Sequence, residues 1–176
     1  HSCVVIGECL VLFGGINNTG IYQNDTWIAQ PATNTTLLLW RLLDVCPLAP
    51  PTYGAHACSS FDNRRMIIHE GIGLPRMRLN DTWVLHLSDN FCFGTWHQSL
   101  TYPVPSPRSG YTLTYIGGTK TLLFGGRGMG YEVLHDVLYF DLSQAHLRWV
   151  PVLFKLCNIP DVLSITRVGH SVTMSL

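Results

Sequence analysis

TLLFGG, residues Thr121–Gly126, is a short apolar run that ends on two glycines. The same phrase occurs at Leu10–Gly15 as LVLFGG and, in altered form, at Arg65–Gly71 as RMIIHEG, so that its last glycines lie 56 and 55 residues apart. Runs of about four branched and aromatic residues are too short for a helix and are typical of buried strands. Glycine at the strand end lets another backbone come close. A fixed period near 55 residues predicts a repeat protein.

Three other landmarks keep the same period: an Asp before the third strand-like segment of each unit, a Trp in the fourth, and a His or Tyr at the start. These landmarks are Asp25, Asp81 and Asp136; Trp40, Trp96 and Trp149; and His1, His56, Tyr111 and His170. Four short strands joined by turns are the content of one propeller blade. No segment keeps a 3.6-residue period, so we expect an all-β fold with minimal helix.

The repeats also predict the organisation of the chain. We expect residues 1–176 to form about three blades of four antiparallel strands each, in an incomplete ring, with units at about 1–55, 56–110 and 111–169 and the start of a fourth at 170–176. The chain opens on His rather than Met and ends inside a strand-like stretch, which favours a fragment of a longer protein.

Composition narrows the function classes. The chain is 47% apolar and 12% charged with a formal net charge of zero, which gives no electrostatic reason to expect nucleic acid or an anionic membrane surface as a partner. No apolar run approaches the length of a transmembrane helix. The six cysteines form no CxxC pair, and we expect reduced thiols in a cytoplasmic or nuclear protein. Four N-x-[ST] sequons and the even cysteine count leave a secreted domain open as an alternative.

Together, the run ending in GG, the downstream Asp and Trp, and the closing phrase PSPRSGY at 105–111 resemble kelch repeats. The repeated NDTW phrase and DVLYFDL at 136–142 look like those of plant F-box/kelch-repeat proteins. The resemblance implies a β-propeller, commonly of about five to seven blades. In that family an F-box docks on a Skp1–cullin ubiquitin ligase and the propeller holds the protein to be degraded. No F-box lies within these residues.

Catalytic motifs are absent from the sequence. His69-Glu70 is not followed by the second histidine of HExxH, the glycines after 125 do not complete GxGxxG, and no GxSxG occurs. We therefore expect no catalytic residue, no metal site, no cofactor and no enzyme activity. A metal-dependent enzyme on a kelch scaffold, with its ligands on other blades, remains a distinct alternative.

The recurring polar and aromatic residues have structural interpretations. We expect the three Asp carboxylates to accept backbone N–H groups where the third strand starts. The three Trp side chains of the fourth strands are expected to pack between blades with the indole N–H bonded locally, as are those of Trp27 and Trp83. The His residues that start the units are expected to be hydrogen-bonded at a strand edge.

Candidate binding residues lie where loops break the repeat. After the glycine pairs these are Arg76 and Arg78 in the second unit and Arg127 and Tyr131 in the third. By resemblance, kelch propellers also bind proteins with the connections from the fourth strand to the next first strand. In this chain those connections supply Tyr53, Arg108, Ser109 and Arg167. Arg offers a bidentate fork for carboxylates, and Arg and Tyr are common interface anchors.

These observations predict a protein-binding propeller domain, the substrate-recognition part of an SCF (Skp1–cullin–F-box) ubiquitin ligase. Its partners would be a protein substrate on the propeller loops, and Skp1 and cullin through the F-box. The alternatives are a kelch scaffold or adaptor with no ligase link and a secreted kelch domain.

Overall fold

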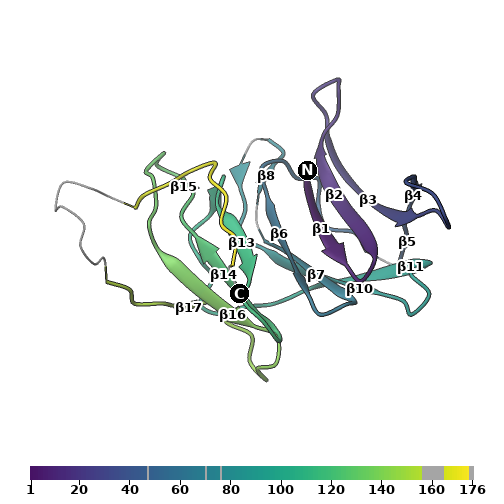
Figure 1. The fold of residues 1–176 in the computed structure, drawn as a ribbon. Coiled ribbons are helices and arrows are strands. Elements are labelled where there is room, and N and C mark those ends of the chain that lie inside the picture. The colour runs from purple at the N-terminus through teal and green to yellow at the C-terminus, as the bar shows by residue number, and fades with distance from the viewer. Residues whose placement is uncertain (47, 70, 76, 156–164, 175–176) are drawn as a thin grey trace.

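The computed structural model describes residues 1–46, 48–69, 71–75, 77–155 and 165–174. Three main sheets of short strands follow one another along the chain, antiparallel apart from one two-residue edge strand, and the described residues contain no helix. The predicted all-β fold with three four-stranded blades in an incomplete ring is confirmed (Figure 1). Among the described residues no helix is long and apolar enough to span a membrane.

Blade 1 is a four-stranded meander in sequence order. Its strands are β1 (Ser2–Ile6), β2 (Cys9–Ile16), β3 (Tyr22–Pro31) and β4 (Leu38–Leu42). The third strand spans ten residues, because its first part pairs with the extension of β2 beyond a register shift between Phe13 and Gly15. Such an irregularity bends the sheet and increases its twist.

Blade 2 has the same meander and one additional edge strand. Its strands are β6 (Ala57–Phe61), β7 (Arg65–His69), β10 (Thr82–Leu87), β11 (Phe93–Gln98) and β5 (Asp44–Val45). The segment that contains Trp40 does not continue as one strand, because β4 stays on blade 1 while β5 pairs in parallel with β11. The chain thus joins the outer edges of the first two blades.

Blade 3 comprises β13 (Thr112–Tyr115), β14 (Lys120–Phe124), β16 (Val137–Asp141) and β17 (Val150–Pro151). Two small ribbons lie in the connections. They are β8 (Ile72–Gly73) with β9 (Met77–Arg78), and β12 (Arg108–Ser109) with β15 (Arg127–Gly128). The first strands β1, β6 and β13 are neighbours in space (Figure 1).

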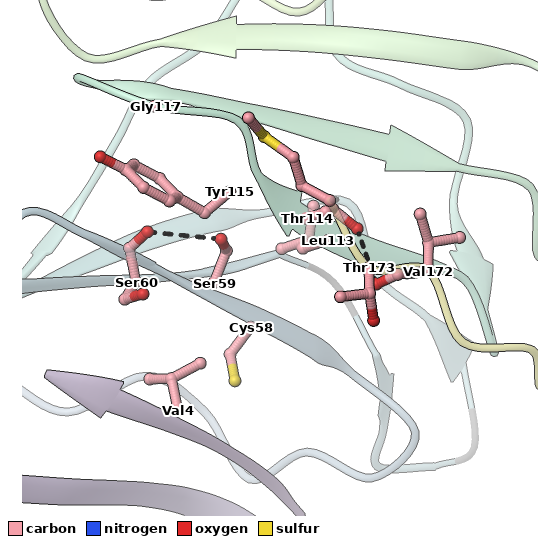
Figure 2. Close-up of a pocket in the computed structure, with 11 residues that line it drawn as sticks. Val4, Cys58, Ser59, Ser60, Leu113, Thr114, Tyr115, Gly117, Val172 and Thr173 are labelled. Carbon is pink, nitrogen blue, oxygen red and sulfur yellow. Dashed lines mark hydrogen bonds between the residues drawn. The ribbon is translucent and has the colours of Figure 1, made fainter. Parts of the chain in front are cut away.

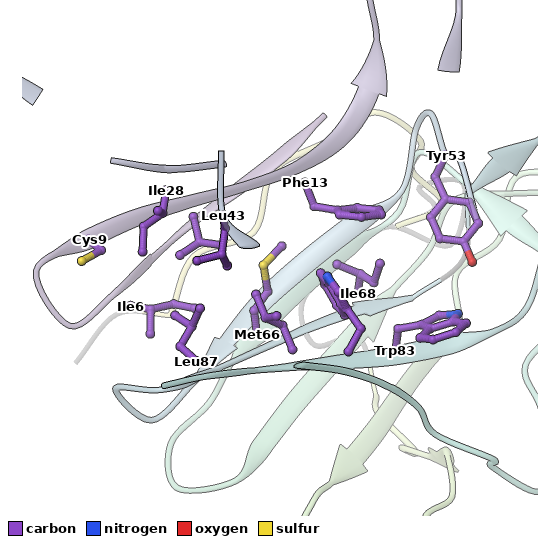
Figure 3. Close-up of a cluster of buried hydrophobic side chains, with 13 residues drawn as sticks. Ile6, Cys9, Phe13, Ile28, Leu43, Tyr53, Met66, Ile68, Trp83 and Leu87 are labelled. Atoms are coloured by element: carbon purple, nitrogen blue, oxygen red, sulfur yellow. The ribbon is translucent and has the colours of Figure 1, made fainter. Parts of the chain in front are cut away.

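The core consists of two layers of side chains, one between each pair of neighbouring blades. In the first layer Phe13 and Ile28 of blade 1 face Met66 and Ile68 of blade 2 (Figure 3). The second layer packs Phe61 and Ile67 against blade 3. Side chains alternate between the two faces of a strand, so blade 2 uses one face toward blade 1 and the other toward blade 3. Fully burying one such side chain contributes about 1.5–3 kcal/mol.

The glycine pairs lie where the connection to the next blade crosses. Gly15 has φ +106° and donates its N–H to the carbonyl of Tyr53 at 2.9 Å; Gly126 has φ +98° and donates to the carbonyl of Arg167 at 2.9 Å. A Cβ on Gly126 would lie 2.8 Å from the Cβ of Tyr111. The predicted close backbone approach at the glycines is therefore confirmed.

Candidate functional site

The tryptophans of the fourth strands hold blades together. The indole N–H of Trp96 donates to the Thr26 hydroxyl of the preceding blade at 3.1 Å, and that of Trp149 donates to Thr82 at 3.3 Å. Both indole rings are 2% exposed, and each packs on an aromatic residue in the second strand of the preceding blade. The predicted packing between blades is confirmed for these two, although the bonds cross the interface rather than being local.

Trp40 departs from the prediction. It occupies the same repeat position but is 46% exposed, because no described blade covers that side of blade 1. The predicted local bonds hold for Trp27 and Trp83, whose N–H groups donate to Asp25 at 2.6 Å and Asp81 at 2.7 Å.

The recurring Asp residues therefore bind side chains, not the backbone N–H groups that we expected. Asp81 accepts from the Trp83 indole and also from the Tyr53 hydroxyl. Asp136 takes two bonds from the Arg108 guanidinium, at 2.6 and 2.8 Å. Asp81 and Asp136 thus tie the start of the third strand of a blade to the connection that enters the blade.

The structure corrects the assignment of Tyr53 and Arg108 to a partner-binding surface. Tyr53 lies in the core, where burial and the hydrogen bond to Asp81 raise the pKa of its hydroxyl. Arg108 is 1% exposed and also donates to the carbonyl of Gly125 at 3.1 Å. Ser109 is buried as well. We therefore expect replacement of Arg108 to lower the stability of the fold rather than to remove a contact with a partner protein.

Two histidines are buried beside these residues. The ring of His56 packs edge-on against Phe13, with centroids 5.5 Å apart, and burial lowers its pKa to about 4. His69 lies 2.7 Å from the Thr82 hydroxyl, and burial followed by the positive charge of Arg108 lowers its pKa to about 3. The predicted hydrogen bond of a unit-starting histidine is seen at His170, whose Nε2 lies 3.3 Å from the Thr112 hydroxyl, but not at His56, whose two ring nitrogens are buried without a hydrogen-bond partner among the described residues. Both buried rings are neutral at pH 7.

Four predicted residues come together around the ribbon of β12 and β15. Arg78 donates from Nε to the Ser109 hydroxyl at 3.0 Å, and its guanidinium lies over the Tyr131 ring, 5.1 Å from the centroid. Arg127 is the cross-strand partner of Ser109. We refer to the side chains of Arg78, Arg127 and Tyr131 as the Arg78–Arg127–Tyr131 surface; Ser109 lies beneath it and positions Arg78.

This surface has features that favour binding. Tyr131 is 71% exposed and has φ +65°, a left-handed conformation that is uncommon for a bulky residue and is found where local strain serves a site. The Nε of Arg127 is buried and has no hydrogen-bond partner among the described residues. Met77 and Met129, on the same two loops, are exposed. The surface therefore combines two guanidinium groups with exposed apolar side chains.

The remaining two predicted binding residues are Arg167 and Arg76, of which the structure describes Arg167. The backbone of Arg167 bonds to Gly126, next to Arg127, and its exposed side chain donates to the carbonyl of Thr166 at 2.7 Å. Arg76 lies outside the described residues.

A cavity of about 420 Å³ lies among the first strands of the blades (Figure 2). Val4 and Cys58 line one side and Leu113 and Thr114 another, with Val172 close by. Burial raises the pKa of the Cys58 thiol to about 12, so the sulfur is protonated at pH 7 and is a weak nucleophile. The lining residues offer packing and hydroxyl groups rather than an acid–base pair. Within the described part of the chain no three His, Cys, Asp or Glu side chains are grouped to hold a metal ion.

The cysteines are free thiols wherever the structure describes them. These are Cys3, Cys9, Cys46, Cys58 and Cys92. Cys157 lies outside the described residues. Reduced thiols were expected, and no disulfide joins the described cysteines.

Comparison with known proteins identifies the family. Residues 1–174 match the family described as "KLHDC2/KLHL20/DRC7 Kelch-repeats domain". The chain belongs to the kelch-repeat family. It is 46% identical, over its whole length, to an F-box/kelch-repeat protein of Arabidopsis thaliana, and it spans 37% of that protein. Over 71% of its length it is 30% identical to Adagio protein 3 of the same plant, of which it spans 20%.

Solved structures agree on the fold of this kelch chain. The structure of YjhT superposes with a TM-score of 0.62 at 18% identity, covering 90% of this chain and 52% of that one. At that identity the likeness shows the architecture alone. The predicted kelch resemblance is confirmed by the family match and by the F-box/kelch relative.

Proposed function

We propose that this kelch chain is a protein-binding module that takes its partner on the Arg78–Arg127–Tyr131 surface. The observation that carries the proposal is the arrangement of Arg127 beside the fixed pair of Arg78 and Tyr131 on exposed loops. Guanidinium groups bind carboxylates in a bidentate manner, and exposed Tyr and Met supply apolar contact. The partner segment would therefore carry acidic side chains next to apolar ones. The role is binding without catalysis.

We further propose that the module selects substrates for an SCF-type ubiquitin ligase. The support is the 46% identity to an F-box/kelch-repeat protein. In that arrangement an F-box outside residues 1–176 would contact Skp1, and the propeller would hold the protein to be ubiquitylated. Such a role places the protein in the cytoplasm or nucleus, which is compatible with the free thiols of the described cysteines. A kelch adaptor without a ligase link is the alternative.

The binding site is tested with the double variant Arg127→Ala/Tyr131→Ala in the full-length protein. Proteins cross-linked to it in cells are quantified by mass spectrometry. We expect at least one protein captured by the wild type to be lost about 30-fold, because truncating an interface anchor costs about 2 kcal/mol or more. The matched control Arg148→Ala/Tyr102→Ala changes exposed residues elsewhere and is expected to leave capture unchanged.

Different results would contradict the binding site and the ligase role. If all captured proteins are unaffected by the double variant, the surface is not the binding site. If capture falls but ubiquitin conjugates of the captured protein stay constant, or Skp1 does not co-purify with the full-length protein, the ligase role is wrong and the adaptor alternative is favoured.

A further inference from the structure

Two arginine side chains converge on one hydroxyl where the two small ribbons meet. These ribbons, β8 with β9 and β12 with β15, lie at the same end of the blades (Figure 1). Arg78 of β9 donates from Nε to the Ser109 hydroxyl of β12 at 3.0 Å. Arg127 of β15 stands directly opposite Ser109 in the antiparallel ribbon, and directly opposite residues lie on the same face with Cβ atoms about 5 Å apart. Ser109 is therefore flanked by both arginine side chains.

Neither arginine of this pair has an acidic partner among the described residues. Arg108 is paired with Asp136, but no described carboxylate lies within ion-pair distance of the two arginines beside Ser109. The carboxylate of Glu132 lies against Gly128. Because successive residues of a strand face opposite sides, it is on the side of the ribbon away from the Arg127 side chain. Two cations held close together without a counter-ion repel each other, and an anion between them removes that cost.

The donors of this cluster match a phosphate monoester better than a carboxylate. Ser109 accepts from Arg78, which leaves its own O–H to donate. The Nε of Arg127 is buried without a hydrogen-bond partner in the part of the chain that the structure describes, so an acceptor that reaches it removes the cost of an unsatisfied N–H. A phosphate monoester carries about −1.5 to −2 charges at pH 7 and three strong acceptor oxygens. A carboxylate has one charge and two oxygens.

The surroundings of the two arginines favour a phosphate that is carried by a protein. The Tyr131 ring stacks on the Arg78 guanidinium and is exposed, so it holds that group in place and offers apolar area beside it. Met77 and Met129 are exposed on the same two loops. Anionic membranes are typically bound by clusters of about four to eight Lys or Arg, and a chain of zero net charge has no such general attraction for polyanions. One phosphate with apolar neighbours is the chemistry of a phosphorylated peptide segment.

We propose that Arg78, Arg127 and Ser109 bind the phosphate of a phosphorylated side chain in the partner protein. The inference rests on the proposed binding role of the Arg78–Arg127–Tyr131 surface and names what that surface selects. Apolar residues next to the phosphorylated side chain contact Tyr131 and the exposed methionines. Capture of the partner then depends on a kinase that acts on it. An unmodified acidic side chain neutralises only one of the two guanidinium groups and is the weaker ligand.

Peptide libraries test the phosphate site directly. The full-length protein on beads is incubated with libraries whose flanking residues are random and whose central residue is phosphoserine, phosphotyrosine, serine or glutamate, and retained peptide is quantified by mass spectrometry. We expect a phosphorylated library to be retained about 30-fold better than the serine library and about 10-fold better than the glutamate library, because its hydrogen bonds are charge-assisted at both guanidinium groups. Inorganic phosphate is expected to compete with the retained peptides.

A conservative variant separates phosphate recognition from charge alone. Arg127→Lys keeps the charge and removes the planar fork of donors, and we expect it to lower retention of the phosphorylated library about 10-fold. Arg148→Lys, at an exposed position outside the two ribbons, is the matched control and should leave retention unchanged. Equal retention of the glutamate and phosphorylated libraries overturns the phosphate site, and so does selective retention that Arg127→Lys does not reduce.

Phosphatase treatment distinguishes this inference from the proposed function. Proteins whose capture depends on Arg127 and Tyr131 are captured again from extract treated with a phosphatase, and we expect their capture to fall about 30-fold. Capture that survives the phosphatase overturns phosphate recognition and leaves the protein-binding role standing. Selective retention of phosphopeptides without any whole protein that depends on the surface contradicts the protein-binding role instead. Tighter binding to vesicles that contain a phosphoinositide than to the phosphopeptides would make a lipid headgroup the ligand and overturn the partner named here.

Discussion

Acidification from pH 7 to pH 5 is expected to lower the free energy of unfolding by about 4 kcal/mol, through two buried histidines. His56 and His69 have pKa values of about 4 and about 3 in the folded chain. In the unfolded chain both titrate near 6.5, so between these values the unfolded state binds more protons. The contribution of the two neutral histidines to the free energy of unfolding is fully present above about pH 6.5. It falls by about 1.4 kcal/mol per pH unit for each histidine as the pH drops toward 4. Urea denaturation at pH 7, 6 and 5 measures the loss.

The repeat itself suggests the control. Tyr111 stands at the position of His56 in the next unit, and Phe13 and Phe124 stand at the position of His69. The double variant His56→Tyr/His69→Phe therefore places in blade 2 the residues that neighbouring blades already use. It loses the His69–Thr82 contact, at about 1 kcal/mol, but its stability should be nearly flat from pH 7 to pH 5. A variant that keeps the slope of the wild type would show that other groups cause it.

The arrangement of blades could be predicted from the sequence because the relevant signals are local. A four-residue apolar run, a glycine pair and a turn each specify a short segment, and their return after 55 or 56 residues specifies the architecture. Trp40 shows where this reasoning stops. The repeat predicts that it is buried, but burial also needs a neighbouring blade, and its side chain is exposed because none is described on that side.

The candidate site was predicted in part. Arg78, Arg127 and Tyr131 lie on loops that break the repeat, and loops that differ between units are where a scaffold carries function. Tyr53 and Arg108 were misassigned because a proline-rich connection is typical of an exposed loop. Their partners are far along the chain, and the available signal was the equal separation of Tyr53 from Asp81 and of Arg108 from Asp136. Composition around each residue could not show this.

The 28-residue separation between Arg108 and Asp136 also identifies a substitution, Asp136→Ala, whose effect on the free energy of unfolding is expected to be comparable to that of acidification. Its carboxylate holds a guanidinium that is 1% exposed by two hydrogen bonds, of 2.6 and 2.8 Å. Breaking a buried pair by removing one partner costs about 3–5 kcal/mol, and the lower end, about 3 kcal/mol, applies here because Arg108 keeps its bonds to the carbonyls of Ser106 and Gly125. We expect a loss of that size in urea denaturation at pH 7, with the native fold retained at low denaturant.

The two partners of this pair should not be equivalent. The Asp136 side chain is 40% exposed, so after Arg108→Met its carboxylate can be hydrated, and the methionine fills the space of the arginine stem. Arg108→Met is therefore expected to cost less than Asp136→Ala. Asp25→Ala is the matched control, because that carboxylate accepts a neutral indole N–H, and its removal should cost about 1 kcal/mol. If Asp136→Ala is no worse than Asp25→Ala, the ion pair does not hold blade 3 to its entering connection.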